Sequence, residues 1–364
     1  MINIQDKLLC CGCEACVQAC PKRCIAFKED SEGFRYPSVD LSACIDCGLC
    51  ETVCPIIRHP EPKEPSKVYA TQNQNEEELL ASSSGGMFIL LAKETLHQGG
   101  VVFGAKYDKD WSVIHSFAET LEDTKAFMGS KYVQSRIGNS FIKAKEYLDT
   151  GRKVLFTGTP CQIAGLKSFL KKDYENLLTV DIICHGVPSP TIWKSYLQGK
   201  EINKVDFRDK RTGWKNYSIT VNNKTIIYHR NHYMRCFLAN LTLRPTCFQC
   251  NFKSGSSCSD LTLGDFWGIS EIAPQLDNDL GTSVTLLNSS KGEKALNGIG
   301  MSFTEIDFDE ICKYNTAIKC SVKKPGDYDL FWADFHATGK KAIIKWGSPK
   351  KMDIFKQFIY RLIH

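Results

Sequence analysis

The 364-residue sequence predicts a mixed α/β fold preceded by a small cysteine-rich domain. Residues 1–57 contain one cysteine pattern twice, and the proline-rich residues 58–67 read as a stiff linker to the rest. Beyond this linker, strand-like apolar runs alternate with segments of helical periodicity, which favours a partly parallel sheet. The composition, 43% hydrophobic and 24% charged, is ordinary for a globular protein with two or three domains.

The two cysteine repeats have the spacing of iron–sulfur ligands. The pattern Cys-x2-Cys-x2-Cys-x3-Cys-Pro occurs at residues 10–21 and, unchanged, at residues 44–55. This doubled pattern is typical of bacterial-type ferredoxins with two four-iron, four-sulfur clusters. The first three cysteines of a repeat surround one cluster, and the fourth ligates the other cluster.

Each predicted cluster therefore takes ligands from both repeats. The first set is Cys10, Cys13, Cys16 and Cys54, and the second set is Cys44, Cys47, Cys50 and Cys20. Zinc is the alternative, but zinc ribbons lack the third closely spaced cysteine and the final Cys-Pro. Cys11 and Cys24 fall outside the pattern and are expected to be small buried residues. Because so short a domain has little core, cluster binding should supply much of its folding free energy.

The larger part begins with a helix predicted over 85–99 and a strand over 101–108. A second strand over 153–158 precedes a helix, and a third follows over 177–184. Shorter strands are predicted at 204–210, 217–223, 225–230 and 283–289. No strand is followed by G-x-G-x-x-G, so a nicotinamide site of the Rossmann type is not indicated.

Four further cysteines are placed where a sheet presents ligands. Cys161 lies in the first turn of a helix, Cys184 ends the next strand, and Cys247 and Cys250 form a C-x2-C pair. Neighbouring parallel strands end side by side, so these residues could bring four thiolates to one site. A zinc site and unrelated buried cysteines remain alternatives. For Cys161 alone, a disulfide or an activated nucleophile also remains open.

Six segments together resemble a known family. They are "SSSGGMFILLAKETL", "GSKYVQS", "TGTPCQIAGL", "DIICHGVPSP", "FRDKRTGW" and "CFQCNFKSGSSCSDLTLGDFWG". In order and content they resemble the beta subunit of coenzyme F420 hydrogenase/dehydrogenase over residues 66–320. The resemblance implies a mixed α/β flavoprotein domain that binds FAD beside a third four-iron cluster, ligated by Cys161, Cys184, Cys247 and Cys250. The substrate, and any use of F420, does not follow from it.

The expected domain organisation combines these observations. A ferredoxin-type domain spans 1–57 and the linker spans 58–67. The resemblance assigns an FAD-binding part to 68–195 and a part that completes the third cluster and the flavin site to 196–335. A helical tail is expected over 336–364. No role is assigned to the remaining cysteines, which are Cys236, Cys258, Cys312 and Cys320.

Two loops resemble the flavin-binding loops of the family. The first contains Ser83, Ser84, Gly85 and Gly86, and the second contains Gly129, Ser130, Lys131 and Tyr132. Hydroxyls and glycine amides at a helix start suit a pyrophosphate, and lysine and tyrosine could add charge and ring contacts. The alternative for the first loop is a helix-capping segment without a ligand.

Other polar residues are weaker candidates. His185 could transfer protons beside a reduced flavin, although a structural histidine is the alternative. A basic, aromatic stretch, Arg208, Lys210, Arg211 and Trp214, could hold an anion or form a solvated loop. Asp260 and Asp265 are expected to orient loop backbone or to contact a substrate.

The cysteines and the N-terminal sequence favour a cytoplasmic protein. The longest apolar stretch, residues 87–92, is too short to span a membrane. The tail at 348–364 is amphipathic and could touch a membrane surface or pack on its own protein. The net charge of +5 does not call for nucleic acid.

The predicted function is an FAD- and iron–sulfur-dependent oxidoreductase. Electrons would pass from ferredoxin, a reductase or a similar partner through the clusters to FAD and on to a small-molecule substrate. Two alternatives remain, an electron-transfer subunit of a larger complex without its own substrate site and an iron–sulfur redox sensor. The sequence shows no nucleic-acid-binding motif, which disfavours the sensor.

Overall fold

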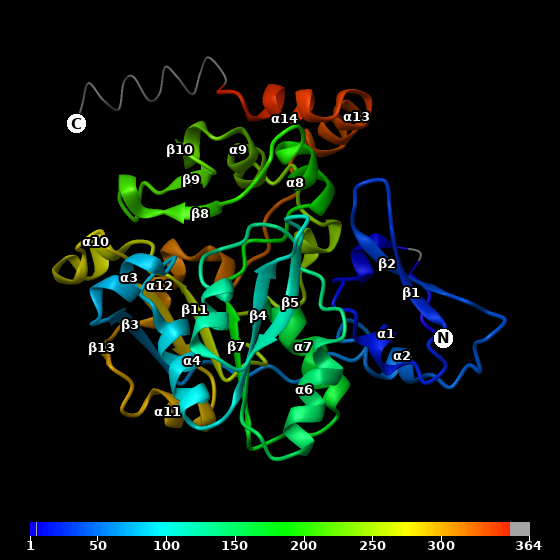
Figure 1. The fold of residues 1–364 in the computed structure, drawn as a ribbon, viewed down its shortest axis with the longest axis horizontal. Coiled ribbons are helices and arrows are strands. Elements are labelled where there is room, and N and C mark those ends of the chain that lie inside the picture. The colour runs from blue at the N-terminus through cyan, green and yellow to red at the C-terminus, as the bar shows by residue number, and fades with distance from the viewer. Residues whose placement is uncertain (5, 350–364) are drawn as a thin grey trace.

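The structure is a computed structural model that describes residues 1–4 and 6–349. An eight-stranded mixed sheet forms its centre, with strand order β13-β3-β12-β11-β7-β6-β4-β5 (Figure 1). The strands are β3 Lys67–Asn73, β4 Val101–Tyr107, β5 Val113–Ala118, β6 Val154–Gly158, β7 Leu177–Ile182, β11 Leu261–Asp265, β12 Ser283–Leu287 and β13 Met301–Glu305. Strands β4, β6, β7 and β11 are parallel neighbours, which confirms the predicted mixed α/β fold.

The apolar run of β6 is buried on both faces, as expected for a central parallel strand. Val154 and Phe156 belong to a core shared with helices α6 Ser140–Asp149 and α7 Pro160–Leu170. Leu155 points into a second core with α4 Met87–His97. The alternation of side chains along the strand therefore divides one apolar run between two helical layers. Helix α11 Ser290–Leu296 lies on the sheet next to β7.

A second, smaller layer packs above the sheet (Figure 1). It contains the antiparallel strands β8 Val205–Asp209, β9 Ser218–Val221 and β10 Lys224–Ile227. Its helices are α8 Pro190–Leu197, α9 His232–Leu238, α13 Tyr328–Thr338 and α14 Lys340–Gly347. Large aromatic side chains, including Trp193, Tyr233 and Phe331, fill its core. The strand predicted over 283–289 does not join this layer, because β12 lies in the main sheet between β3 and β11.

The N-terminal domain packs against α6 and α7 (Figure 1). It consists of α1 Ala15–Ala19, α2 Leu49–Thr52 and a hairpin of β1 Ile25–Glu29 and β2 Arg35–Val39. Gln18 Oε1 accepts hydrogen bonds from the backbone N–H groups of Phe141 and Ile142, at 3.0 and 3.1 Å. Because these donors lie in the first turn of α6, Gln18 satisfies helix-end groups of the other domain.

Short helices complete the described chain: α3 Glu76–Ala81, α5 Leu121–Thr124, α10 Ile269–Ile272 and α12 Phe308–Tyr314. The predicted linker reaches β3, which begins at Lys67. Across residues 1–4 and 6–349, no helix has the length and apolar character needed to cross a bilayer. The amphipathic tail predicted over 348–364 falls almost wholly outside the described residues.

Candidate iron-sulfur sites

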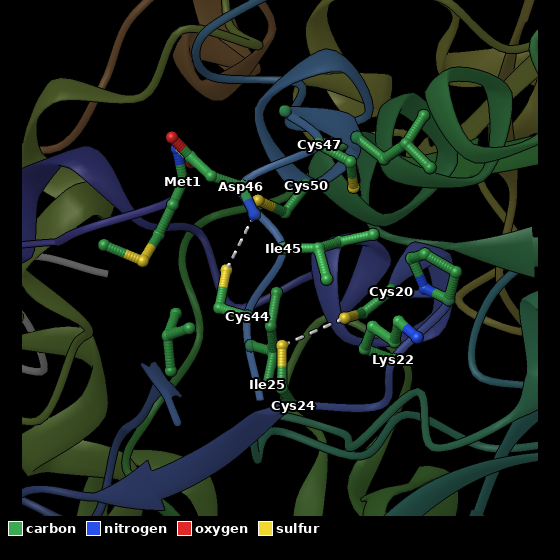
Figure 2. A pocket seen from close by; sticks show the side chains of 14 residues that line it. Met1, Cys20, Lys22, Cys24, Ile25, Cys44, Ile45, Asp46, Cys47 and Cys50 are labelled. Carbon is green, nitrogen blue, oxygen red and sulfur yellow. Dashed lines mark hydrogen bonds and ion pairs between the residues drawn. The ribbon is translucent and has the colours of Figure 1, made fainter. Parts of the chain in front are cut away.

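The second predicted ligand set lines one cavity of the N-terminal domain. Figure 2 shows this cavity, which Cys20, Cys44, Cys47 and Cys50 line together with apolar residues such as Ile25 and Ile45. One cysteine comes from the first repeat and three come from the second, as the sequence predicts. The donor set, four thiols around an apolar cavity, is chemically suited to an iron–sulfur cluster.

Backbone N–H groups point at two of these sulfurs. The Asp46 N–H donates to Cys44 Sγ at 3.4 Å, and the Ile2 N–H donates to Cys50 Sγ at 3.2 Å. Hydrogen bonds to ligand sulfur are one of the means by which a protein sets a cluster's reduction potential. Cys24 also lines the cavity, with its Sγ 3.4 Å from Cys20 Sγ, so it is buried as expected but lies beside a predicted ligand.

The two repeats fold alike because they share a backbone pattern. In the first repeat Gly12 and Glu14 have φ of 73° and 61°, and in the second repeat Asp46 and Gly48 have φ of 47° and 72°. The third and fifth positions of each repeat are thus left-handed, with glycine at one of them in each case. Two left-handed residues curl each segment, so that its cysteines converge.

The first predicted set is also gathered and buried. Cys10, Cys13, Cys16 and Cys54 are each at most 9% exposed. Burial and the charges of Cys10 and Cys54 raise the pKa of Cys16, so these thiols are close neighbours. A group of crowded, desolvated thiols is costly when ionised and is compensated by metal ligation. The arrangement therefore fits a cluster.

The third predicted set meets at the carboxyl end of the parallel strands. Strands β6 and β7 are neighbours, and α7 starts at Pro160 directly after β6, as predicted. Burial and the charges of Cys247, Cys161 and Cys250 raise the pKa of Cys184. Burial, together with the charge of Cys161, raises the pKa of Cys247 to about 12 and that of Cys250 to about 11. The four thiols, which come from three separate segments, therefore influence one another electrostatically.

The environment of Cys161 does not resemble that of an activated nucleophile. The α7 N-terminus would favour a thiolate, and Thr159 Oγ1 lies 3.2 Å from Cys161 Sγ. The adjacent Cys11 thiol, followed by burial, nevertheless raises the pKa of Cys161 well above its usual value. Such a thiol is protonated at neutral pH unless a metal displaces the proton.

Cys11 lies between two of the sets. Its thiol interacts with those of Cys13 in the first set and Cys161 in the third. Its side chain is 6% exposed and belongs to the same core as both neighbours. The sequence pattern predicts no role for Cys11 beyond burial, but the structure places it at the junction of the N-terminal domain and α7.

Across the described residues, no three His, Cys, Asp or Glu side chains are close enough to hold a single metal ion. A tetrahedral zinc ion holds its sulfurs at about 2.3 Å, which places them close to one another. A cluster of four irons is wider than one ion and holds its thiolates further apart.

In the first predicted flavin loop, three of the four residues form hydrogen bonds within the protein. Ser83 Oγ accepts hydrogen bonds from the N–H and the hydroxyl of Ser130, at 2.7 and 3.0 Å. Ser84 Oγ and the Gly85 N–H donate to residues 282–283 at 3.0 and 2.8 Å. The Ser84 hydroxyl and the Gly85 N–H, two of the groups expected to hold a pyrophosphate, thus tie the loop to residues 282–283.

In the second loop, the Lys131 ammonium also forms hydrogen bonds within the protein. Lys131 Nζ donates to three nearby backbone carbonyls, one of which is that of Gly129. Burial lowers the pKa of Lys131 to about 7, so it is a weak fixed charge. The Tyr132 ring packs on aromatic neighbours of the upper layer. Gly86 has a φ of 81° and is the N-cap of α4, which is the capping role considered for the first loop.

The remaining candidates have structural partners. His185 Nε2 lies 2.7 Å from Asn240 Oδ1, and burial lowers the pKa of the imidazole. Asp260 Oδ2 accepts hydrogen bonds from the backbone N–H and the hydroxyl of Thr179, at 2.8 and 2.7 Å. Arg208 forms a buried ion pair with Asp265 at 2.9 Å.

The other residues of the basic stretch are also engaged. Lys210 Nζ donates to three backbone carbonyls, one of them that of Ser84, while Arg211 pairs with Asp209. Trp214 stacks on Trp267. Arg208 and Trp214 are therefore buried in the fold, whereas the Arg211 side chain is 62% exposed.

Sequence reasoning missed Arg244, a guanidinium that is 1% exposed among the cysteines. Its partners come from segments far apart in the chain, so no local pattern could have revealed it. The "LRPTC" context shows only a cation ahead of the C-x2-C pair.

The fold and the grouped thiols define an iron–sulfur electron-transfer protein with a ferredoxin-like N-terminal domain. More particularly, residues 151–310 match the family of the carboxyl-terminal part of the coenzyme F420 hydrogenase/dehydrogenase beta subunit, and residues 9–56 match the "4Fe-4S dicluster domain" family. Residues 151–310 therefore resemble the F420 hydrogenases and dehydrogenases, which confirms the predicted resemblance over this part of the chain.

Individual proteins are similar to the larger part of the chain and to its N-terminal domain. The F subunit of F(420)H(2) dehydrogenase from Methanosarcina mazei is 23% identical over 218 residues, which are 55% of this chain and 60% of that protein. A 7Fe ferredoxin of Hydrogenibacillus schlegelii is 48% identical over 42 residues, 12% of this chain and 47% of that protein. The chain thus matches 60% and 47% of the length of these two relatives, less than two thirds of each. A chain of the F420-reducing [NiFe] hydrogenase complex from Methanosarcina barkeri superposes with a TM-score of 0.48 at 16% identity, covering 70% of this chain and 91% of the other.

These findings correct one prediction. The FAD-dependent enzyme expected from the resemblance is wrong, because the matched family and the relative share the coenzyme F420 in their names, and neither names FAD. The structure gives a physical reason for the error. Two of the donors assigned to the pyrophosphate of FAD, the Ser84 hydroxyl and the Gly85 N–H, bond within the protein instead. The iron–sulfur part of the prediction is confirmed by the dicluster domain.

Proposed function

We propose that this chain is an electron-transfer subunit of a larger redox complex, in which its N-terminal clusters and a third cluster carry single electrons to or from a partner protein. Four-iron clusters supply one-electron storage when bound. The ligands would be the three cysteine sets defined above. The partner protein would carry out the two-electron chemistry of an F420-type coenzyme.

The main observation behind this proposal is that the first and third thiol sets lie close to each other. Cys11 interacts with Cys13 of the first set and with Cys161 of the third. Helix α7 also brings the two sets together, because Gly165 lies against Cys13 one turn after Cys161. A short separation between redox centres is the main requirement of an electron-transfer chain, and this packing supplies it.

The second cysteine set lies where a partner protein could approach it. Cys47 is exposed, and so are the neighbouring Ile45 and Leu41, at 58% and 68%. A cluster held by this set would lie near the protein surface, where another protein could approach it. The protein's own groups would fix the sulfurs and exclude water around the inner two sets.

The proposal is tested with the isolated, anaerobically purified chain and two probes, benzyl viologen and F420. We expect rapid one-electron exchange with reduced viologen, seen as bleaching of the cluster absorbance, and no hydride exchange with F420. Catalytic reduction of F420 by the isolated chain would contradict the proposal, because it requires a substrate site within this chain. Lack of any exchange with viologen would contradict it as well.

A further inference from the structure

Arg244 is a buried cation that joins the two domains. It immediately precedes the 3-10 helix Pro245–Gln249, which carries Cys247. Its Nε donates to the carbonyl oxygen of Cys10 at 2.8 Å, and its Nη2 donates to that of Arg35 at 3.0 Å. The remaining amino group, Nη1, donates to Gln134 Oε1 at 3.1 Å. The guanidinium therefore connects the first cysteine repeat, β2 and the larger domain.

No anionic side chain accepts these hydrogen bonds. The acceptors are two carbonyls and one amide oxygen, and aromatic faces cover the rest of the group. Its Cζ lies 4.3 Å from the ring centroid of Tyr36 and 5.5 Å from that of Phe34. Among the ion pairs of the described residues, none involves Arg244. A fully buried charge is expensive without a compensating charge, so a negative group is expected nearby.

The candidates for that negative group are cysteines of two sets. Burial lowers the pKa of Arg244, but the charges of Cys10, Tyr36, Cys11 and Cys247 outweigh this effect and raise it. Cys10 belongs to the first set, and Cys247 belongs to the third. Arg244 is also bonded to a residue of each set through the backbone, because its Nε donates to the Cys10 carbonyl oxygen at 2.8 Å and its own carbonyl oxygen accepts from the Cys247 N–H at 2.9 Å.

Glycine at position 12 makes room for this arrangement. A Cβ on Gly12 would lie 2.9 Å from Arg244 Nη1 and 2.7 Å from Gln134 Nε2. Gln134 Nε2 also donates to the carbonyl oxygen of Cys11 at 3.2 Å. The loop that carries the first ligands is therefore held by two side chains that press against its only glycine.

We propose that Arg244 is a positioning residue that fixes the Cys10–Cys11 backbone and supplies a positive charge shared by the first cluster and the third cluster. The part that concerns the third cluster rests on the proposed function. Reduction adds one electron, and hence one negative charge, to a cluster that already carries net negative charge. A fixed cation nearby stabilises that state and raises the reduction potential.

The experiment compares Arg244→Met and Arg244→Lys with the wild-type chain. Each protein is purified without oxygen, its iron is counted, and its cluster potentials are measured by titration with dithionite followed by electron paramagnetic resonance. Methionine removes the charge, whereas lysine keeps the charge but lacks the planar guanidinium and its fixed hydrogen-bond donors. The second set, Cys20, Cys44, Cys47 and Cys50, is an internal control, because Arg244 makes none of its described contacts there.

We expect Arg244→Met to lower the potential of the first cluster, and of the third where it is present, by at least the equivalent of a tenfold change in electron occupancy, about 59 mV for one electron. The second cluster should keep its potential, and Arg244→Lys should recover most of the loss. Unchanged potentials at full iron content would overturn the proposal, and so would an equal fall for every cluster.

Two further outcomes are also decisive. If Arg244→Met loses iron, Arg244→Lys with full iron and wild-type potentials supports the proposal, and loss of iron from both variants overturns it. Failure of the proposed function is seen separately. A wild-type chain with only two clusters would remove the third site, yet the effect of Arg244 on the first cluster would still be measured.

Discussion

Gly165 of α7 lies directly against Cys13 of the first cysteine repeat: a Cβ on Gly165 would be 2.9 Å from Cys13 Cβ and 3.0 Å from Cys13 Sγ. Both distances are shorter than side-chain carbons normally approach. Helix α7, which begins at Pro160, therefore needs a glycine at its sixth position to receive the N-terminal domain. This contact sets how closely the first and third thiol sets can approach each other.

Gly165→Ala should destabilise the protein despite the better helix propensity of alanine. The propensity gain is roughly 1 kcal/mol, whereas overpacking a rigid contact costs about 1–3 kcal/mol. Cys13 cannot move away when it is fixed as a ligand. Guanidinium unfolding of the iron-loaded protein measures the effect, with Gly300→Ala as a control because a Cβ there meets no atom within 4 Å. A Gly165→Ala protein at least as stable as the wild type would refute the close contact.

Cys161→Ser should remove the iron of the third site and leave that of the N-terminal domain. We expect a loss of about four irons and four sulfides per chain, because one ligand of a four-cysteine site is lost. Cys320→Ser is the control, since Cys320 is exposed and belongs to none of the three sets. Full iron content in Cys161→Ser, combined with lost electron transfer, would instead support the nucleophile alternative.

His115 should make stability depend on pH. It is buried, its Nε2 lies 3.0 Å from the Thr157 carbonyl oxygen and its Nδ1 lies 3.0 Å from Ser135 Oγ. The carbonyl can only accept, so Nε2 carries the proton and Nδ1 accepts from the serine. Burial lowers the pKa of His115 from 6.5 to about 4, which means that the folded protein keeps this imidazole neutral.

The direction of the pH effect follows from this shift. Between pH 6.5 and 4 the unfolded chain binds more protons than the folded chain, so stability is complete above 6.5 and falls as pH decreases. The full loss from this residue is about 3 kcal/mol. Denaturant unfolding between about pH 7.5 and 4 measures it. His115→Gln should show a shallower decline over the same range, and an identical decline would show that other groups cause it.

Asp265→Asn should destabilise the larger domain strongly. The Arg208 side chain is 2% exposed, its Nη1 is 2.9 Å from Asp265 Oδ2, and its Nε and Nη2 have no hydrogen-bond partner among the described residues. Removing the carboxylate leaves a buried cation, which typically costs about 3–5 kcal/mol. Thermal or denaturant unfolding should show this loss. The exposed pair of Asp309 and Lys319 is the matched control, and Asp309→Asn should leave stability unchanged within error.

The local features of the sites were accessible from the sequence, while the long-range ones were not. The cysteine spacing predicts the two N-terminal sets, and the strand and helix patterns place Cys161 at the start of α7. These features depend on residues close in the chain. The surroundings of Arg244 depend instead on Cys10, Arg35 and Gln134, which only the folded chain brings together.

At the flavin loops, the sequence instead predicts a ligand site from a local pattern that also fits a loop without a ligand. Residues 82–86 have the composition of a phosphate-binding loop, and the family resemblance favours the same interpretation. Two of their donors, the Ser84 hydroxyl and the Gly85 N–H, bond to residues 282–283, about two hundred positions further along the chain. A hydroxyl-rich, glycine-rich segment looks the same in sequence whether a ligand or a distant strand satisfies its hydrogen bonds. The capping alternative explains Gly86, which begins α4.

The central claim is that three sets of four cysteines carry three four-iron clusters. Its most direct test is the count of iron and acid-labile sulfide per chain on protein purified without oxygen. The account predicts about twelve irons and a matching amount of sulfide, since each cluster contains four of each. About eight irons, with the thiols of Cys161, Cys184, Cys247 and Cys250 free to react, would contradict it and leave only the N-terminal clusters.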